Sequence, residues 1–214
     1  GGITRDWLEA ALSGYAPGVR VNSFEMVDFI NTTCTKIRLS LDLENNRDDA
    51  PIPRTVILKG GFEAHSRKMW PMHKNEALSY ATLMPQLGLR VPQPYFAHWD
   101  EQALQGIVIM EDLVARGVTF CSPLAPHTFE HTLKRVKALA RFHAQTWDSP
   151  EIRPGGRWDW VADMPANWNL YFHPYFEPDS WDHYIRSARG AAASVKFHDR
   201  EWMLDALDRM AALA

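Results

Sequence analysis

Alternation of apolar and polar residues marks the first half of the chain. The clearest run extends from Cys34 to Leu43, where Ile or Leu at every second position is separated by Lys, Arg, Ser and Asp. Because successive side chains of a strand point to opposite faces, this run predicts a strand with one buried face. Similar runs predict four more strands, at Val19 to Ile30, Arg54 to Gly60, Val91 to His98 and Gly106 to Met110.

A spacing of three to four residues between apolar positions predicts helices elsewhere in the chain. Residues 4–13 form a short predicted helix with Thr4 as its N-cap. A second helix fits Pro71 to Leu87, with proline in the first turn, where it is tolerated. The strongest pattern runs from Thr128 to Trp147, and a last helix is predicted from about Asp199 to Leu213.

The order of these elements predicts the class of fold. Because no strand-helix-strand repeat of the parallel type occurs, we expect an antiparallel sheet of five strands with one inserted helix, an α+β arrangement. The pattern changes to helices and loops after Leu113. We therefore predict two lobes, residues 1–113 with the sheet and residues 114–214 with most of the helices.

The composition is that of an ordinary globular protein. Apolar residues make up 46% and charged residues 23% of the 214 positions, which argues against global disorder. The net charge of −3 shows no basic excess that would indicate nucleic acid as a partner. No apolar run approaches the roughly 20 residues that a membrane-spanning helix needs. The two cysteines, Cys34 and Cys121, lie far apart and are expected to be reduced thiols of a cytoplasmic protein, whose oligomeric state the sequence leaves open.

Lys59 ends an apolar strand and shares one strand face with Ile57, two residues earlier. A lysine ammonium group is costly to bury unless an anion meets it. A nucleotide triphosphate and a carboxylate are both suitable anions. The alternative is that Lys59 only marks the solvent-exposed end of the strand.

Glu76 lies in the middle of the apolar stripe of the helix predicted after that strand. At about 100° per residue, Met72, Tyr80 and Leu83 fall in the same sector as Glu76. A buried carboxylate needs a partner, and we predict that it forms an ion pair with Lys59. Kinases hold nucleotide phosphates with such a strand lysine and helix glutamate. The alternative is a glutamate that touches water at the edge of the stripe.

An apolar strand runs directly into two acidic residues near position 110. This connector consists of Met110, Glu111, Asp112 and Leu113. Kinases place the adenine against such a connector, where main-chain N–H and C=O groups recognise it and side chains matter little. We therefore predict adenine recognition by this main chain, with Ile57 and Ile109 as apolar walls. The alternative is a buried strand that simply ends at the surface.

The order of these features resembles the aminoglycoside phosphotransferase and CHK, or ecdysteroid-kinase-like, superfamily. Three phrases look more narrowly like its bacterial ecdysteroid-kinase-like subgroup, namely Pro53-Arg54-Thr55 with Lys59-Gly60-Gly61-Phe62, Gly88-Leu89-Arg90-Val91-Pro92, and Glu111-Asp112-Leu113-Val114-Ala115-Arg116-Gly117. The resemblance covers nearly the whole chain and implies a protein-kinase-like fold that uses ATP and Mg2+. It implies that Lys59 contacts the phosphates and that Glu76 orients Lys59.

Two features depart from the pattern of that superfamily. The first turn is rich in threonine rather than glycine, and Thr32 and Thr33 would cover the phosphates with their N–H and hydroxyl groups. The loop His-Gly-Asp-x-His-x-x-Asn, which supplies the catalytic Asp and a metal-binding Asn, does not occur, and Asp199 is better explained as a helix N-cap. We therefore expect the catalytic Asp after Ala214, assign no catalytic or metal-binding residue to residues 1–214, and expect this span to be inactive.

Three interpretations follow. The first is an ATP-dependent phosphotransferase that acts on a hydroxyl group of a small molecule. The second is a non-catalytic, pseudokinase-like module that binds a nucleotide or another ligand in the same cleft. The third is an unrelated α+β interaction domain in which Lys59 and Glu76 are only structural. Nothing in the sequence identifies the acceptor, because a fold does not fix a substrate.

Overall fold

The chain forms two compact units, residues 1–160 and residues 161–214, which are described separately. The computed structural model describes residues 2–46, 48–49, 51–122, 125–161 and 171–213. The predicted division into lobes at residue 113 rests on the change from strands to helices after Leu113, and the contacts that define the two units do not test it. It stays a prediction.

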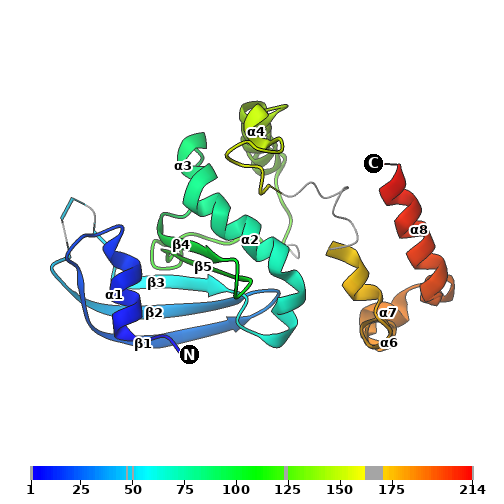
Figure 1. Cartoon of the computed structure of the whole chain (residues 1–214), viewed down its shortest axis with the longest axis horizontal. Coiled ribbons are helices and arrows are strands. Elements are labelled where there is room, and N and C mark those ends of the chain that lie inside the picture. The colour runs from blue at the N-terminus through cyan, green and yellow to red at the C-terminus, as the bar shows by residue number, and fades with distance from the viewer. Residues whose placement is uncertain (1, 47, 50, 123–124, 162–170, 214) are drawn as a thin grey trace. The chain divides into compact units, whose positions relative to one another are not determined.

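A five-stranded antiparallel sheet forms the centre of the first unit and confirms the predicted α+β class (Figure 1). The strands lie in the order β1-β2-β3-β5-β4, so that β1 and β4 are the two edges. Their bounds are Arg20–Asn31 for β1, Thr35–Glu44 for β2, Thr55–Gly60 for β3, Pro94–Asp100 for β4 and Gln105–Glu111 for β5. The first three lie within one residue of the predicted ranges, whereas β4 begins three residues later than predicted.

Helix α1, Arg5–Ser13, covers one face of the sheet. The hydroxyl group of Thr4 accepts a hydrogen bond from the N–H of Trp7 at 3.2 Å and so caps the helix as predicted. The main core lies between this helix and the sheet. Its fully buried side chains include Leu8, Leu12, Leu39, Val56, Leu58 and Ile109.

The opposite face of the sheet is covered by the segment after β3, in which the sequence predicted one helix from Pro71 to Leu87. It is divided into four parts, a 3-10 helix at Ala64–Met69, helix α2 at Trp70–Leu78, a π-helical turn at Ser79–Leu83 and helix α3 at Met84–Leu87. We attribute the interruption to Pro85, which has no N–H group to donate and whose ring crowds the carbonyl of Ala81. Gly88 follows the predicted end of the helix at Leu87 and adopts the left-handed conformation, with φ of 57°.

A second, smaller cluster joins α2 to the sheet. Ala77 of α2 is fully buried against Val108 and Met110 of β5, and Ile57 of β3 packs beside them. This contact holds α2 at a fixed height above β3 and β5. It therefore positions every side chain that α2 presents to this face.

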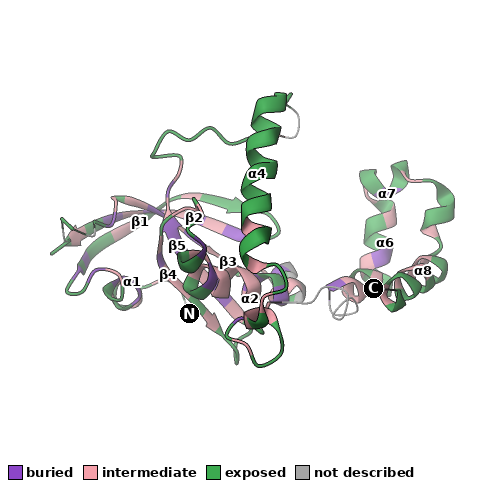
Figure 2. Ribbon diagram, turned by 90° about the horizontal axis from the view of Figure 1, so that it is seen from above, coloured by how far each residue is buried: buried purple, intermediate pink, exposed green. Residues whose placement is uncertain are grey.

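Helix α4, Phe129–Thr146, lies within one residue of the predicted range at each end, and the hydroxyl of Thr128 caps it by accepting from the N–H of His131 at 3.2 Å. None of its residues is buried, however, and apolar side chains of its stripe are exposed, as Figure 2 shows in green. A groove of about 470 Å³ runs between α4 and α3. In the part of the chain that the structure describes, no helix combines the length and the apolar character needed to cross a bilayer.

The described residues of the second unit include helices α6 at Pro178–Arg186, α7 at Ala188–Ala192 and α8 at Arg200–Ala212. The carboxylate of Asp199 accepts the N–H of Trp202 at 3.0 Å, which confirms its role as the N-cap of α8. No pattern in the sequence predicted α6 and α7, which lie in and after a stretch rich in tryptophan and proline.

The first prediction concerns Gly106 on β5. A Cβ atom added there would lie 2.5 Å from the carbonyl oxygen of His73 on α2. Gly106→Ala should therefore push α2 away from β5 and lower the free energy of unfolding by about 1–3 kcal/mol, as overpacking usually does. Urea denaturation followed by circular dichroism measures this change.

The matched control is Gly14→Ala. A Cβ atom at Gly14 meets no atom within 4 Å, and its φ of −67° suits alanine. We expect a change within about 0.5 kcal/mol. Equal losses in the two variants would show that the contact between α2 and β5 is not the cause.

Candidate functional site

The register of three neighbouring strands decides which side chains share a face with Lys59. Lys36 on β2 pairs directly with Lys59 on β3, and Lys59 pairs with Val108 on β5. Side chains of directly opposite residues point to the same face of a sheet. The face that α2 covers in part therefore carries Lys36 and Lys59 side by side, and we call it the site face.

The predicted ion pair between Lys59 and Glu76 is present. The ammonium group of Lys59 donates a hydrogen bond to Oε1 of Glu76, and the two side chains are 20% and 29% exposed. Burial on its own would lower the pKa of Lys59, but the hydrogen bond and the charge of Glu76 raise it above the ordinary value. Lys59 is thus a fixed, fully charged cation at neutral pH. Its position in a cleft between the two lobes stays a prediction.

Lys36 is a residue that the sequence reasoning missed. It lies directly opposite Lys59, and among the described residues no carboxylate lies within salt-bridge distance of its ammonium group. Its Nζ atom donates to the hydroxyl of Thr32 at 3.0 Å. Like charges directly opposite each other destabilise a sheet. An anion between the two ammonium groups would remove this repulsion.

The threonine-rich turn lies next to these lysines. Thr32 donates from its N–H and its hydroxyl group to the carbonyl of Cys34, at 3.2 and 3.1 Å. The carbonyl of Thr33 accepts from the hydroxyl of Ser66 at 3.2 Å. Internal hydrogen bonds therefore shape the turn, although both threonines are exposed. That Thr32 and Thr33 cover phosphates stays a prediction.

His73 is buried beside the ion pair. Burial lowers the pKa of its imidazole below the ordinary value; Glu76 acts in the opposite direction, and Lys59 acts with burial. Its Nε2 atom has no hydrogen-bond partner among the described residues. A neutral His73 does not compete with Lys59 for the carboxylate of Glu76.

Ile57 lies on the site face, as predicted, and pairs with Met110. The prediction that Ile109 forms a second wall is wrong. Ile109 pairs with Leu58 and is fully buried in the core on the opposite face. A shift of one residue moves a side chain to the other face of a sheet, and the sequence alone did not fix this register. Met110 takes the place expected of Ile109.

The connector is held by hydrogen bonds that engage several of its own groups. Glu111 points to the opposite face, where its carboxylate pairs with Arg116 at 2.8 Å, and its N–H donates to the carbonyl of Gln93 at 2.8 Å. The carbonyl of Leu113 accepts from the N–H of Val118 at 3.0 Å. The side chain of Glu111 therefore cannot serve the site face, and only the remaining main-chain groups of the connector are open to a ligand.

Asp112 is almost completely buried and takes part in a charged network that the sequence did not indicate. Its Oδ2 atom accepts from Nε of Arg38 at 2.9 Å, and its Oδ1 atom accepts from the N–H of Val114 at 3.1 Å. The guanidinium of Arg38 also donates to Asp28 at 2.9 Å. The three charged residues lie on three different segments, so no local pattern could have predicted the network. Each oxygen of the Asp112 carboxylate therefore accepts a hydrogen bond from within the protein.

Comparison with known proteins identifies the family of the chain. The model of the ecdysteroid kinase-like family matches residues 28–154, more than half of the 214 residues. The chain belongs to the ecdysteroid kinase-like family. This confirms the resemblance at the level of the family and excludes the third interpretation, an unrelated interaction domain. It indicates a kinase-like phosphotransferase at the level of the family, and the bacterial subgroup stays a prediction. Searches of curated proteins and of solved structures found no match.

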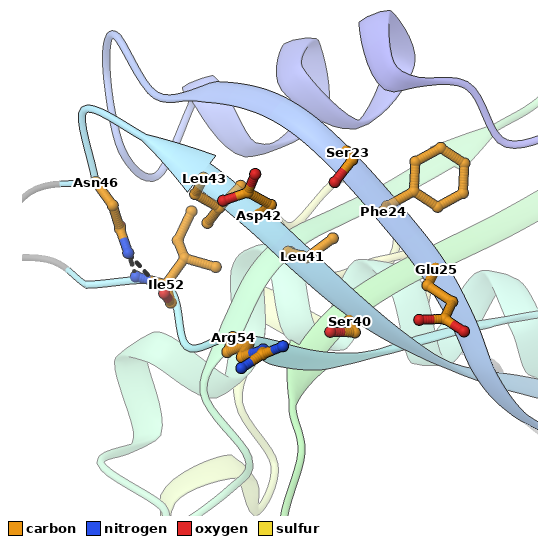
Figure 3. Close-up of a pocket in the computed structure, with 10 residues that line it drawn as sticks. All are labelled: Ser23, Phe24, Glu25, Ser40, Leu41, Asp42, Leu43, Asn46, Ile52 and Arg54. Atoms are coloured by element: carbon orange, nitrogen blue, oxygen red, sulfur yellow. Dashed lines mark hydrogen bonds between the residues drawn. The ribbon is translucent and has the colours of Figure 1, made fainter.

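A polar pocket of about 600 Å³ extends the site face away from Lys59. Ser40 and Asp42 of β2, Glu25 of β1 and Arg54 line it (Figure 3). A smaller pocket of about 330 Å³ adjoins the connector beside Asp112. The site face thus runs from two lysines at the threonine turn to a polar hollow at the opposite end of β2.

The second prediction tests the ion pair of this family member by a double-mutant cycle with Lys59→Met and Glu76→Gln. Both side chains are less than one-third exposed, so we expect a coupling of about 1–2 kcal/mol in the free energy of unfolding. Urea denaturation of the four proteins measures it.

The control cycle uses Lys134→Met and Glu130→Gln, an i,i+4 pair on α4 whose side chains are 69% and 73% exposed. Such a pair should show a coupling of about 0.5 kcal/mol or less. A Lys59–Glu76 coupling no larger than that of the control pair would contradict the prediction.

Proposed function

We propose that the chain binds ATP on the site face and forms the nucleotide-binding part of an ATP-dependent phosphotransferase that acts on a hydroxyl group of a small molecule. One observation carries the proposal. Lys36 and Lys59 lie directly opposite each other, and among the described residues only Lys59 has a carboxylate partner, Glu76. We call this pair of opposite residues the lysine rung. Its excess positive charge suits a polyphosphate.

The two lysines would have different roles toward the triphosphate. Lys59 is held in one position by Glu76, so it would contact the phosphates with a fixed geometry. Among the described residues, the hydroxyl of Thr32 alone accepts a hydrogen bond from Lys36, and none of their carboxylates would cancel the charge that Lys36 supplies. Thr32 and Thr33 would cover the phosphates from the turn, and ATP would supply the phosphoryl group that is transferred.

The base would lie toward the other end of the same face. Ile57 and Met110 form one rung of apolar side chains there, one step from the lysine rung. The main-chain groups of Asp112 and Leu113 that remain open would recognise the adenine edge. This assignment uses the connector as the sequence predicted it, with Met110 in place of Ile109 as a wall.

Mg2+ is proposed as the second cofactor because kinase-like enzymes need it to bridge phosphate oxygens. Among the described residues, no three His, Cys, Asp or Glu side chains gather in a way that would hold a metal ion. We therefore assign no metal ligand within this region. We place the catalytic Asp after Ala214, because the 214 residues contain no His-Gly-Asp sequence.

A second candidate function is that of a pseudokinase-like module that binds a nucleotide without transferring phosphate. The same absence of His-Gly-Asp from the 214 residues favours it. The two candidates share the site face and differ only in whether a catalytic Asp completes it. For both we propose a cytoplasmic protein, because Cys34 and Cys121 are unpaired.

The third prediction concerns ATP binding. Lys59→Met and Lys36→Met should each weaken the binding of ATP by about tenfold or more, because a hydrogen bond to a charged group contributes about 1.5–3 kcal/mol. Isothermal titration calorimetry in the presence of Mg2+ measures the affinity. Circular dichroism of each variant checks that the fold is retained.

Lys134→Met removes the same charge from an exposed position on α4 and serves as the control. It should leave the affinity within about twofold of the wild type. If all three lysine variants bind ATP equally well, the site face is not the phosphate site.

The fourth prediction is that the 214-residue chain releases no ADP above background when it is mixed with ATP, Mg2+ and a panel of hydroxylated small molecules. The transfer needs a carboxylate that faces the acceptor and metal ions that bridge the phosphates, and we assign neither to this span. A coupled ADP assay measures turnover, and ATP titration of the same sample checks that it is competent to bind. Acceptor-dependent ADP release would show that a catalytic carboxylate lies within the span.

A further inference from the structure

Arg38 lies on the site face between the lysine rung and the polar pocket. It pairs with Ile57 across β2 and β3, one step from Lys36 and Lys59. Its guanidinium donates from Nε to Asp112 and from Nη1 to Asp28, both at 2.9 Å. A planar guanidinium can hold two carboxylates at once in fixed directions, which a lysine cannot. Arg38 thus connects β1, β2 and the connector.

The pair of Arg38 with Asp112, the inner arm of this network, shapes the connector. Oδ1 of Asp112 accepts the N–H of Val114 at 3.1 Å, and its main-chain carbonyl accepts the N–H of Arg116 at 3.4 Å. The turn that follows β5 is therefore built around Asp112. The side chain of Asp112 is only 3% exposed, and a carboxylate buried to this degree is strongly destabilising without its cation. The conformation of the turn consequently depends on Arg38.

The pair of Arg38 with Asp28, the outer arm of the network, contributes less to its stability. Asp28 lies at a β-bulge of the edge strand β1, and its side chain is 43% exposed. Solvent screens an ion pair at such a position, so its contribution is small. The main effect of Arg38 is therefore directed inward, to Asp112 and the connector.

We infer that Arg38 is a positioning residue for recognition of the base: through Asp112 it fixes the connector main chain in the conformation that reads adenine. The inference rests on the proposed function, because it assigns the base to this connector. Arg38 does not contact the phosphates in this arrangement, since Lys36 and Lys59 occupy the neighbouring rung. Its loss should therefore weaken the recognition of adenine and leave the recognition of phosphate unchanged.

The test compares two probes, ATP and inorganic tripolyphosphate, by calorimetry in the presence of Mg2+. The main variant is the double substitution Arg38→Met with Asp112→Asn, which removes one positive and one negative charge and leaves no buried ion unpaired. We expect ATP to bind about tenfold more weakly, the equivalent of one or two lost hydrogen bonds, while the affinity for tripolyphosphate stays within about twofold. Lys36→Met should instead weaken both probes.

Two further variants examine the geometry of the network. Arg38→Lys keeps the charge but cannot hold Asp28 and Asp112 together, so its ATP affinity should fall between those of the wild type and the double variant. Asp28→Asn removes only the outer arm and should bind ATP within about twofold of the wild type. Arg20→Met, which breaks a surface pair with Glu9 at 3.2 Å, is the control for a lost arginine on β1.

The outcomes separate this inference from the proposed function. A wild-type chain that binds neither probe overturns both. If the wild-type chain binds both probes, two results for the double variant overturn the role of Arg38. Either its affinity falls by the same factor for both probes, or its affinity falls for neither. In both cases the proposal that ATP binds on the site face is unaffected. A selective loss of ATP affinity with an unchanged melting temperature supports the positioning role, because a general loss of structure would affect both probes.

Discussion

The register of β2, β3 and β5 is the constraint on which the site depends. Leu39, Leu58 and Ile109 are fully buried on the core face, and a slip of one residue in any strand would expose them. Full burial of such a side chain contributes about 1.5–3 kcal/mol, so the core strongly disfavours a slip. The core face thereby also fixes the opposite face, where Lys36 lies opposite Lys59. The charged site is positioned by apolar side chains that it never contacts.

The ion pair of Lys59 and Glu76 is better explained by binding than by stability. Removing two charges from water is costly, and a half-buried pair repays that cost only in part. Apolar side chains at both positions would fill the same space between α2 and β3 without that cost. A lysine held in one direction by a carboxylate is useful where a third, anionic group approaches it. Because Gly106 has no side chain, the main chain of α2 lies close to β5, and Glu76 on α2 is therefore near enough to hold Lys59.

The sequence predicted what local patterns determine and missed what depends on pairing between segments. Alternation placed the first three strands closely, and helical spacing placed Glu76 in a stripe that faces Lys59. The faces of Ile109 and Lys36 depend on how β5 and β2 align with β3, which neither strand specifies alone. Arg38 and Asp112 are 74 positions apart, and their contact follows only from the complete sheet order. Pro85 indicated an interruption of the helix, but the helical spacing of the apolar residues around it favoured one continuous helix.

The charges of the site face separate into two kinds. Lys59 and Arg38 each have a carboxylate partner, so each contributes direction but little net charge to the surface. Lys36 has no such partner among the described residues, and it therefore contributes most of the attraction that this face offers to an anion. A site built only from paired cations would orient a ligand without drawing it in, and one built only from unpaired cations would attract any anion. In the proposed function, this combination would attract a polyphosphate at one rung and would leave selection among polyphosphates to the connector that Arg38 holds.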